Sequence, residues 1–560
     1  MSTNEEGVLK HATLNRYIRG SRASPSTVQF RNLKYASIPA RFKDSVPDDT
    51  LNPPGLDNVV DATQFGPSCP HVRGSQAWDL TLIGNAVLPC EYGQGETEKM
   101  DEFECLHVNV TVPRTALDAG GGKKGTLGLP VFVWVHGGGL SMGSNSWPQY
   151  DLRRFVERSV EIDKPIIGVS INYRLNIFGF LASEEIGADG NMGFKDQVLA
   201  FQWIKKHIAG FGGDPTNIIA AGESAGAISL STLLCANVGD EGLFNSVVLM
   251  SGEATLRKWR NRWWHQKMYE DQSQYLKLDP NDSEGRRKAL LDSDAEELAQ
   301  KLPLAQHFCA TMDGQFLTQD VTIEALMSGS SAVHNPSWCK EFVMGDTAHD
   351  GLVLKARVLD QPECSERLQK ACNMHLSHSQ TQELVSAYGL DRPLRKEDEA
   401  ARLLELVSEL RFYLPVLEAH QSWRSCSPPK RASRYHFHVP NPMDGPFKGL
   451  ASHELDVAYL LYNYVDHFDE HDRMIAKTMQ DQFLGFINGE GWAKDGKMVV
   501  FGYDGAVEVD EEKYDEMYRK GRGAVLEKIG IQKLWCVAET WQGVRQEEEE
   551  QLRLPGDSKL

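Results

Sequence analysis

Several features that mark other protein classes are missing from this sequence of 560 residues. No stretch approaches the roughly 18 consecutive apolar residues of a transmembrane helix, so we expect no membrane span. The ten cysteines form no C-x-x-C pair, which argues against a zinc cluster or a thioredoxin-type motif. The glycine-rich stretch 118–128 lacks the GK[ST] of a phosphate-binding loop. We interpret it as a long hairpin turn between strands at 106–112 and 129–135.

Positive charge is also scarce. The chain has 59 lysines and arginines against 78 aspartates and glutamates, which gives a formal net charge of −19. This balance argues against nucleic acid and anionic membranes as partners. The N-terminal stretch MSTNEEGVLKHATLNRY has no apolar core, so the chain as given is not expected to enter the secretory pathway.

What the sequence does contain is an alternation of short apolar runs and helical patterns, with no internal repeat and no long linker. Apolar residues from Phe194 to Ile208 recur on one helical face. The predicted strands are short and rich in β-branched residues: 130–135, 165–173, 217–221, 245–251, 341–345 and 434–439. Such an alternation predicts an α/β fold with a mostly parallel sheet covered on both faces. We therefore expect one domain over residues 1–560, with a charged tail from about 545 to 560.

The stretch NIIAAGESAGAISL, residues 217–230, fits the pattern G-x-S-x-G where a predicted strand gives way to a predicted helix. A serine on such a turn is lifted out of the sheet, and flanking glycines avoid clashes with bulky neighbours. The pattern alone is equally compatible with an ordinary Gly-Ser turn. The strand before it and the helix after it favour Ser224 as a nucleophile. The Ala225 N–H would then lie at a helix N-terminus, where it can stabilise an oxyanion.

A second glycine-rich motif, HGGG, follows the predicted strand 130–135 and stands 85 residues before the serine, counted from its last glycine. Consecutive glycines let backbone N–H groups turn towards a carbonyl oxygen. We predict that Gly138 and Gly139 form a three-donor oxyanion hole with Ala225. His136 is expected to pack or hydrogen-bond locally and not to act as a base.

Together these stretches resemble the type-B carboxylesterases, the branch of the α/β-hydrolases that includes cholinesterases and several fungal lipases. The resemblance runs from about residue 30 to about 505 and is most specific between Gly190 and Ala227. FRNLKYASIPARF, ECLHVNV, PVFVWVHGGG and NYRLNIFGFL also carry it. It implies an α/β-hydrolase fold, with a large, mostly parallel twisted sheet, helices on both faces and cap or lid insertions.

The family's triad runs serine, acid, histidine in chain order. The acid context aligns with EFVMGDTAHDGLVL, which implies Asp350 where the family usually has glutamate, with Asp346 as the competitor. The role needs a carboxylate that orients the imidazole, and aspartate can serve. The histidine context aligns with GLASHELDVAYLL and implies His453. Asp456 falls where the family often has a second carboxylate, and we assign it no catalytic role.

The resemblance also implies roles for three further side chains. Ser251 matches a serine that in the family supports the triad residues without contacting the substrate. An ordinary hydroxyl at the end of a strand explains Ser251 nearly as well. Cys69 and Cys105 match the N-terminal disulfide pair of the family. A disulfide would be unusual in a reducing compartment, so the sequence leaves their redox state open.

These residues imply a serine hydrolase that cleaves small-molecule carboxylic esters through an acyl-enzyme, with no metal or organic cofactor. An acyltransferase or lactonase would use the same triad, and the sequence does not separate it from hydrolysis. A more distant alternative is a non-catalytic adhesion or scaffold protein on the same fold. The presence of Ser224, Asp350 and His453 argues against that alternative.

The last three residues, Ser558, Lys559 and Leu560, form the S-K-L address that the peroxisomal import receptor reads. The residues before them are polar and include Pro555 and Gly556, which favours an extended tail. We therefore expect a peroxisomal location with that receptor as a partner. The alternative is a cytoplasmic protein with an accidental tail. A fluorescent protein fused to the N-terminus should give punctate signal that becomes diffuse when the tripeptide is deleted.

Overall fold

The computed structural model of the chain describes residues 7–543, apart from 52, 56–57, 89–97, 119–127, 305, 320, 324, 326–334 and 428. The charged tail and the S-K-L residues lie outside the described residues, so the location remains a prediction. Among the described residues, no helix combines the length and apolar character needed to cross a bilayer.

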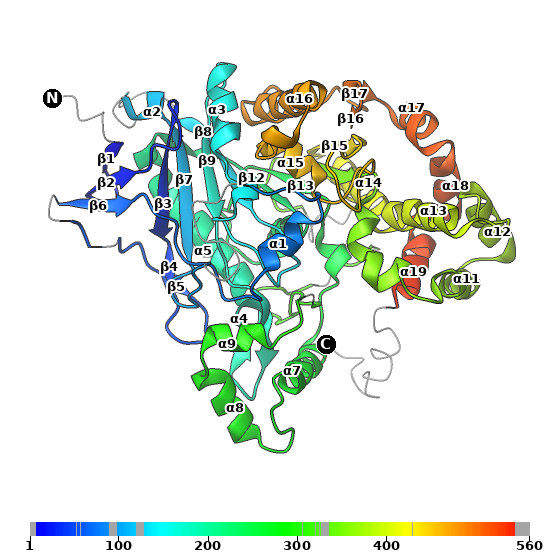
Figure 1. Cartoon of the computed structure of the whole chain (residues 1–560), viewed down its shortest axis with the longest axis horizontal. Helices are drawn as coiled ribbons and strands as arrows, with labels where there is room; N and C mark the ends of the chain where they lie inside the picture. Colours follow the sequence, from blue (N-terminus) through cyan, green and yellow to red (C-terminus); the bar gives the residue numbers. More distant parts are fainter. Residues whose placement is uncertain are drawn as a thin grey trace.

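A ten-stranded mixed sheet forms the centre of the molecule (Figure 1). Its strands, in spatial order, are β17 (Gly505–Val509), β16 (Met498–Gly502), β15 (Arg431–Phe437), β14 (Glu341–Thr347), β13 (Ser246–Met250), β12 (Gly213–Glu223), β8 (Leu129–Val135), β9 (Ile167–Ile171), β7 (His107–Pro113) and β3 (Thr27–Lys34). From β16 to β9 every neighbouring pair is parallel. β17, β7 and β3 each pair antiparallel with their neighbours. The mostly parallel sheet is therefore confirmed, and all six predicted strands lie in its parallel part.

The predicted hairpin across 118–128 is wrong, because β7 and β8 are not neighbours. β9 lies between them, antiparallel to β7 and parallel to β8. A parallel pair needs a crossover connection, and α3 (Arg153–Glu161) lies in the connection from β8 to β9. The helix α2 (Arg114–Asp118) follows β7, and most of the glycine-rich stretch lies outside the described residues.

Both faces of the sheet are buried, which explains its continuous apolar strands. Along β8 the side chains alternate between two cores, with Val133 in one and Trp134 in the other. The first core includes apolar residues of α5 (Met192–His207) and α6 (Ala225–Cys235). The second includes residues of α3, α15 (Leu455–Leu461) and α16 (Glu470–Ile487). The helix predicted near 194–208 is thus confirmed as α5.

Additional helices lie in the long connections between successive strands of the sheet. Between β13 and β14 lie α7 (Arg262–Tyr275), α8 (Ser283–Asp292) and α9 (Ala295–Gln300). Between β14 and β15 lie α11 (Cys364–His375), α12 (His378–Ala387), α13 (Lys396–Ser408) and α14 (Leu414–Ser425). The last helices are α17 (Glu511–Tyr514), α18 (Arg522–Ile529) and α19 (Ile531–Gln542). In Figure 1 the first group projects below the sheet, and α18 and α19 lie beside α11 to α13 at the right.

The remaining elements are short. They are β1 (Val8–His11), β2 (Arg16–Gly20), β4 (Ala36–Ser37), β5 (Val46–Pro47), β6 (Val59–Ala62), α1 (Ser75–Leu80), α4 (Asn176–Phe180), β10 (Ala182–Ser183) and β11 (Ala188–Asp189). The segments that follow the carboxyl ends of β8, β12, β14 and β15 carry the glycine loop, Ser224, Asp350 and His453, at the edge where parallel sheets place their functional groups.

Candidate active site

Ser224 occupies a sharp turn between β12 and α6. Its backbone has φ 51° and ψ −118°, a conformation that residues other than glycine rarely adopt. The Ser224 N–H donates to the Met250 carbonyl of β13 at 2.9 Å. A Cβ on Gly226 would overlap the Val135 carbonyl, and one on Gly222 would lie 2.7 Å from the Gly226 carbonyl carbon. The two glycines around the serine are therefore required because α6 begins in direct contact with β8 and β12.

The glycine loop after β8 turns beside this serine. Gly138 has φ 96°, and a Cβ there would overlap the Met142 carbonyl. The Gly138 carbonyl accepts from the N–H groups of Ser141 and Met142 at 3.0 and 3.1 Å. Among the hydrogen bonds of the described residues, none uses the N–H of Gly138, Gly139 or Ala225 as donor. These three N–H groups are thus available to an acceptor that is not part of the fold.

His453 and Asp350 form a buried pair. Nδ1 of His453 lies 2.6 Å from Oδ1 of Asp350, and Oδ2 of Asp350 accepts from the Thr347 N–H at 2.8 Å. A short parallel bridge between His349 and Ser452, the residues just before the pair, joins the two loops. Two segments more than a hundred residues apart therefore meet at one edge of the sheet.

The competing carboxylate, Asp346, is held by a different histidine. Asp346 of β14 and His436 of β15 are register partners, and Nδ1 of His436 lies 2.6 Å from Oδ1 of Asp346. Asp456, to which we assigned no role, accepts a hydrogen bond from the Tyr435 hydroxyl at 2.7 Å. Of these three carboxylates, Asp350 is the one that contacts His453.

Glu223 was not predicted, although it lies inside the quoted serine motif. Its Oε1 lies 3.0 Å from Nε2 of His453, on the ring edge opposite Asp350. Burial lowers the pKa of His453, but the Glu223 and Asp350 carboxylates outweigh it and raise that pKa well above 6.5. Burial also raises the pKa of Glu223. The position directly before the serine, at the end of β12, is the sequence signal that would have pointed to it.

Two further carboxyl groups, Asp79 and Glu454, lie near the histidine. The Tyr150 hydroxyl oxygen lies 2.5 Å from Oε1 of Glu454 and 3.1 Å from Oδ2 of Asp79. Burial, together with the nearby Glu223, raises the pKa of Asp79 to about 6. Burial and the charge of Asp79 raise the pKa of Glu454 well above 4.5. This side of the site therefore holds several carboxyl groups that retain their protons more readily than in water.

Ser224, His453, Gly138 and Gly139 line one cavity of about 380 Å³. Its apolar lining includes Trp78, Leu82, Met142, Ile228 and Phe412, and two arginines, Arg257 and Arg357, also face it. A cavity of this size with apolar walls and a few polar groups is suited to a small organic molecule.

Several predicted side chains lie outside this cavity. Ser251 is buried with φ 50°, and within the described residues its Oγ has no hydrogen-bond partner, so its supporting role remains a prediction. Cys69 and Cys105 are buried free thiols, so the implied disulfide is absent from this structure. A hydrogen bond with Cys69 and burial raise the pKa of Cys105 well above 9.0. His136 stacks on Tyr173, with ring centroids 4.6 Å apart, which agrees with local packing.

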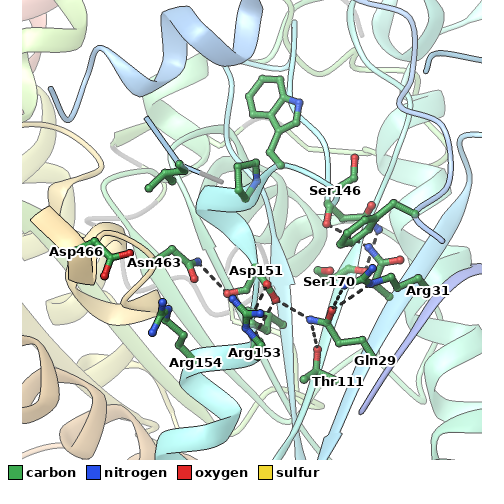
Figure 2. A pocket seen from close by; sticks show the side chains of 17 residues that line it. Gln29, Arg31, Thr111, Ser146, Asp151, Arg153, Arg154, Ser170, Asn463 and Asp466 are labelled. Carbon is green, nitrogen blue, oxygen red and sulfur yellow. Dashed lines mark hydrogen bonds and ion pairs between the residues drawn. The ribbon is translucent and has the colours of Figure 1, made fainter. Parts of the chain in front are cut away.

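A second cavity, of about 180 Å³, lies beside β3 and β7 (Figure 2). Figure 2 shows Gln29 between Thr111 and Asp151, and its Nε2 donates to Asp151 at 2.6 Å. Arg31 donates to the Gln29 Oε1 from Nε and Nη2 at 3.1 and 2.8 Å. These groups bond to one another, so we interpret this polar pocket as part of the scaffold. In the described part of the chain, no three His, Cys, Asp or Glu side chains are placed to hold a metal ion.

Comparison with known proteins supports a common ancestry with esterases and lipases. Lipase 3 of Yarrowia lipolytica is 28% identical over 86% of this chain and 89% of its own length. Lipase 1 of the same yeast is 36% identical over 40% of this chain and 42% of its own length. The para-nitrobenzyl esterase of Bacillus subtilis is 34% identical over 40% of each chain.

Solved structures agree with this similarity. A thermophilic PNB esterase covers 93% of this chain and is itself covered completely, with a TM-score of 0.67 and 20% identity. A carboxylesterase of Geobacillus stearothermophilus gives a TM-score of 0.66 at 23% identity. At such identities the structures show the α/β-hydrolase fold alone. The model of the carboxylesterase family matches residues 14–501, so this chain belongs to the carboxylesterase family.

Proposed function

We propose that the protein hydrolyses carboxylic esters through an acyl-enzyme on Ser224, with His453 as the base and Asp350 as its partner. One observation carries this proposal: Ser224 on its strained turn and His453, paired with Asp350, line the same cavity. Free oxyanion donors at the same place and membership of the carboxylesterase family support it further.

The first step forms the acyl-enzyme. The hydroxyl of Ser224 attacks the ester carbonyl, and Nε2 of His453 takes its proton. The N–H groups of Gly138, Gly139 and Ala225 donate to the oxyanion that develops on the carbonyl oxygen. The imidazolium formed on His453 lies between the Asp350 and Glu223 carboxylates, which stabilise its positive charge.

The second step releases the product. His453 gives its proton to the leaving alkoxide, and the alcohol departs. Water, deprotonated by the same imidazole, attacks the acyl carbon, and collapse of the second oxyanion frees the carboxylic acid and the Ser224 hydroxyl. No metal or organic cofactor takes part in this scheme.

The test is active-site labelling combined with turnover. A fluorophosphonate should label Ser224, and Ser224→Ala should remove the label and most hydrolysis of short-chain esters. Ser379→Ala, at an exposed serine of α12, is the control and should behave like the wild type. Undiminished ester hydrolysis by Ser224→Ala would refute the proposed function.

A further inference from the structure

Arg257 places a positive charge against the predicted oxyanion loop. It ends a short helical turn, Ala254–Arg257, that follows β13. Its Nη1 donates to the Phe308 carbonyl at 2.8 Å and more weakly to the Gln306 carbonyl at 3.4 Å. Its Nη2 lies 3.1 Å from the position that a Cβ on Gly139 would occupy. The two carbonyl groups therefore hold the guanidinium beside Gly139, in the wall of the catalytic cavity.

Among the residues that the structure describes, none supplies a counter-charge to Arg257. Within the described ranges, no carboxylate forms an ion pair with it, and Nη1 alone has hydrogen-bond acceptors. Arg357 faces the same cavity and adds a second positive charge. Burial, followed by repulsion from Arg357, lowers the pKa of Arg257 to about 10, which still leaves it protonated at neutral pH. A cation held in a cavity in this way is normally satisfied by an anion, and guanidinium suits a carboxylate.

The charges of the cavity are unevenly distributed. Asp79, Glu223 and Glu454 lie around His453, which protonates the leaving alkoxide in the proposed mechanism. An anionic alcohol part would be repelled by the Glu223 carboxylate beside His453, and burial makes the neighbouring Asp79 and Glu454 poor hosts for a further negative charge. Arg257 lies beside Gly139, where the carbonyl oxygen of the substrate is expected to bind. A negative charge on the acyl part can therefore approach this guanidinium, with which no described carboxylate forms an ion pair.

We propose that the preferred substrates are esters whose acyl part ends in a carboxylate, such as half-esters of aliphatic dicarboxylic acids, and that Arg257 binds this carboxylate with help from Arg357. This inference rests on the proposed function, because it assigns the substrate class of the same cavity. The free donors of Arg257 determine specificity, while Ser224 and His453 perform the chemistry.

The experiment compares matched esters. The substrates are monoethyl adipate, neutral ethyl hexanoate, and the butanoate ester of 4-hydroxybutanoate, which carries its carboxylate on the alcohol side. Chromatography measures how fast each ester disappears. The wild type should show the highest kcat/KM with monoethyl adipate. Arg257→Met should lower the kcat/KM ratio of monoethyl adipate to ethyl hexanoate by roughly tenfold or more, the effect of losing a hydrogen-bonded charge pair.

Two variants serve as comparisons. Arg257→Lys retains the charge and should keep a larger part of the preference than Arg257→Met. Arg395→Met removes an arginine whose side chain is 79% exposed, and it should leave the ratio unchanged. If Arg257→Met does not fold, the wild type alone still decides: adipate should inhibit cleavage of ethyl hexanoate more strongly than hexanoate does.

The outcomes separate this inference from the proposed function. Cleavage of ethyl hexanoate that depends on Ser224, without a preference for monoethyl adipate, would overturn the inference and leave the proposed function standing. A preference for the alcohol-side carboxylate, or an unchanged ratio in Arg257→Met, would overturn the inference in the same way. Cleavage that persists in Ser224→Ala would overturn both.

Discussion

Two aspartates four residues apart offer a direct test of the catalytic assignment. Asp350→Asn removes the carboxylate 2.6 Å from Nδ1 of His453, and Asp346→Asn removes the one 2.6 Å from Nδ1 of His436. The two changes are alike in chemistry, depth and hydrogen-bond length. They differ in which histidine loses its partner.

The expected magnitudes differ by orders of magnitude. Without Asp350, His453 loses the group that holds its tautomer and stabilises its positive charge, and kcat should fall by about 10⁴, or about 5 kcal/mol of transition-state stabilisation. Burial and the nearby Asp350 raise the pKa of Asp346 well above 3.8, which favours its protonated form, and asparagine has the shape of that form. Asp346→Asn should therefore cost about 1 kcal/mol of folding stability and leave kcat within a few-fold.

The assay is steady-state hydrolysis of a neutral ester, with urea denaturation of both variants to measure folding stability. The assignment predicts a folded, nearly inactive Asp350→Asn and an active Asp346→Asn. The reverse result, with Asp346→Asn inactive and Asp350→Asn active, would refute the assignment of Asp350. Asp350→Glu adds a separate measurement, because retained activity would show that the site accepts the longer side chain usual in the family.

Two further predictions concern the serine turn and its histidine. The Glu223 carboxylate raises the pKa of His453, so Glu223→Gln should lower that pKa. Because the neutral imidazole is the base, the rising limb of the pH profile of kcat/KM should move to lower pH. Glu512→Gln, at an exposed residue, is the control, and a rising limb that stays in place in Glu223→Gln would contradict this role of Glu223. Gly226→Ala places a methyl group against the Val135 carbonyl, so it should destabilise the fold by about 1–3 kcal/mol. The same clash should displace Ser224 and abolish fluorophosphonate labelling. Normal stability and labelling would show that α6 can shift to admit a side chain.

The strand–serine–helix turn could be predicted because its causes are local. A run of apolar residues, glycines on both sides of Ser224 and a following helical pattern occupy fourteen consecutive residues, 217–230. The steric reason given for the glycines is matched by contacts with Val135 and Gly226. Six of the seven strands in the parallel part, all but β16, and α5 could be predicted for the same reason, because burial on both faces leaves a continuous apolar signature.

The order of the strands could not be read in this way. The runs at 106–112 and 129–135 look like a hairpin because they are close in sequence, yet β9 separates them. The pairing depends on the position that β9 takes between β7 and β8. That position is determined by the packing of α3 and of the sheet as a whole. No local pattern carries this information.

Local sequence was enough to predict the fold class, the serine turn and the glycine loop, because backbone sterics and apolar periodicity act over a few residues. The family pattern added His453 and Asp350. Three contacts became visible only in the folded chain: Asp346 faces His436, Glu223 faces His453, and Arg257 lies beside Gly139. Those contacts join residues from separate loops, and electrostatic partners depend on distances in space that positions along the chain do not encode.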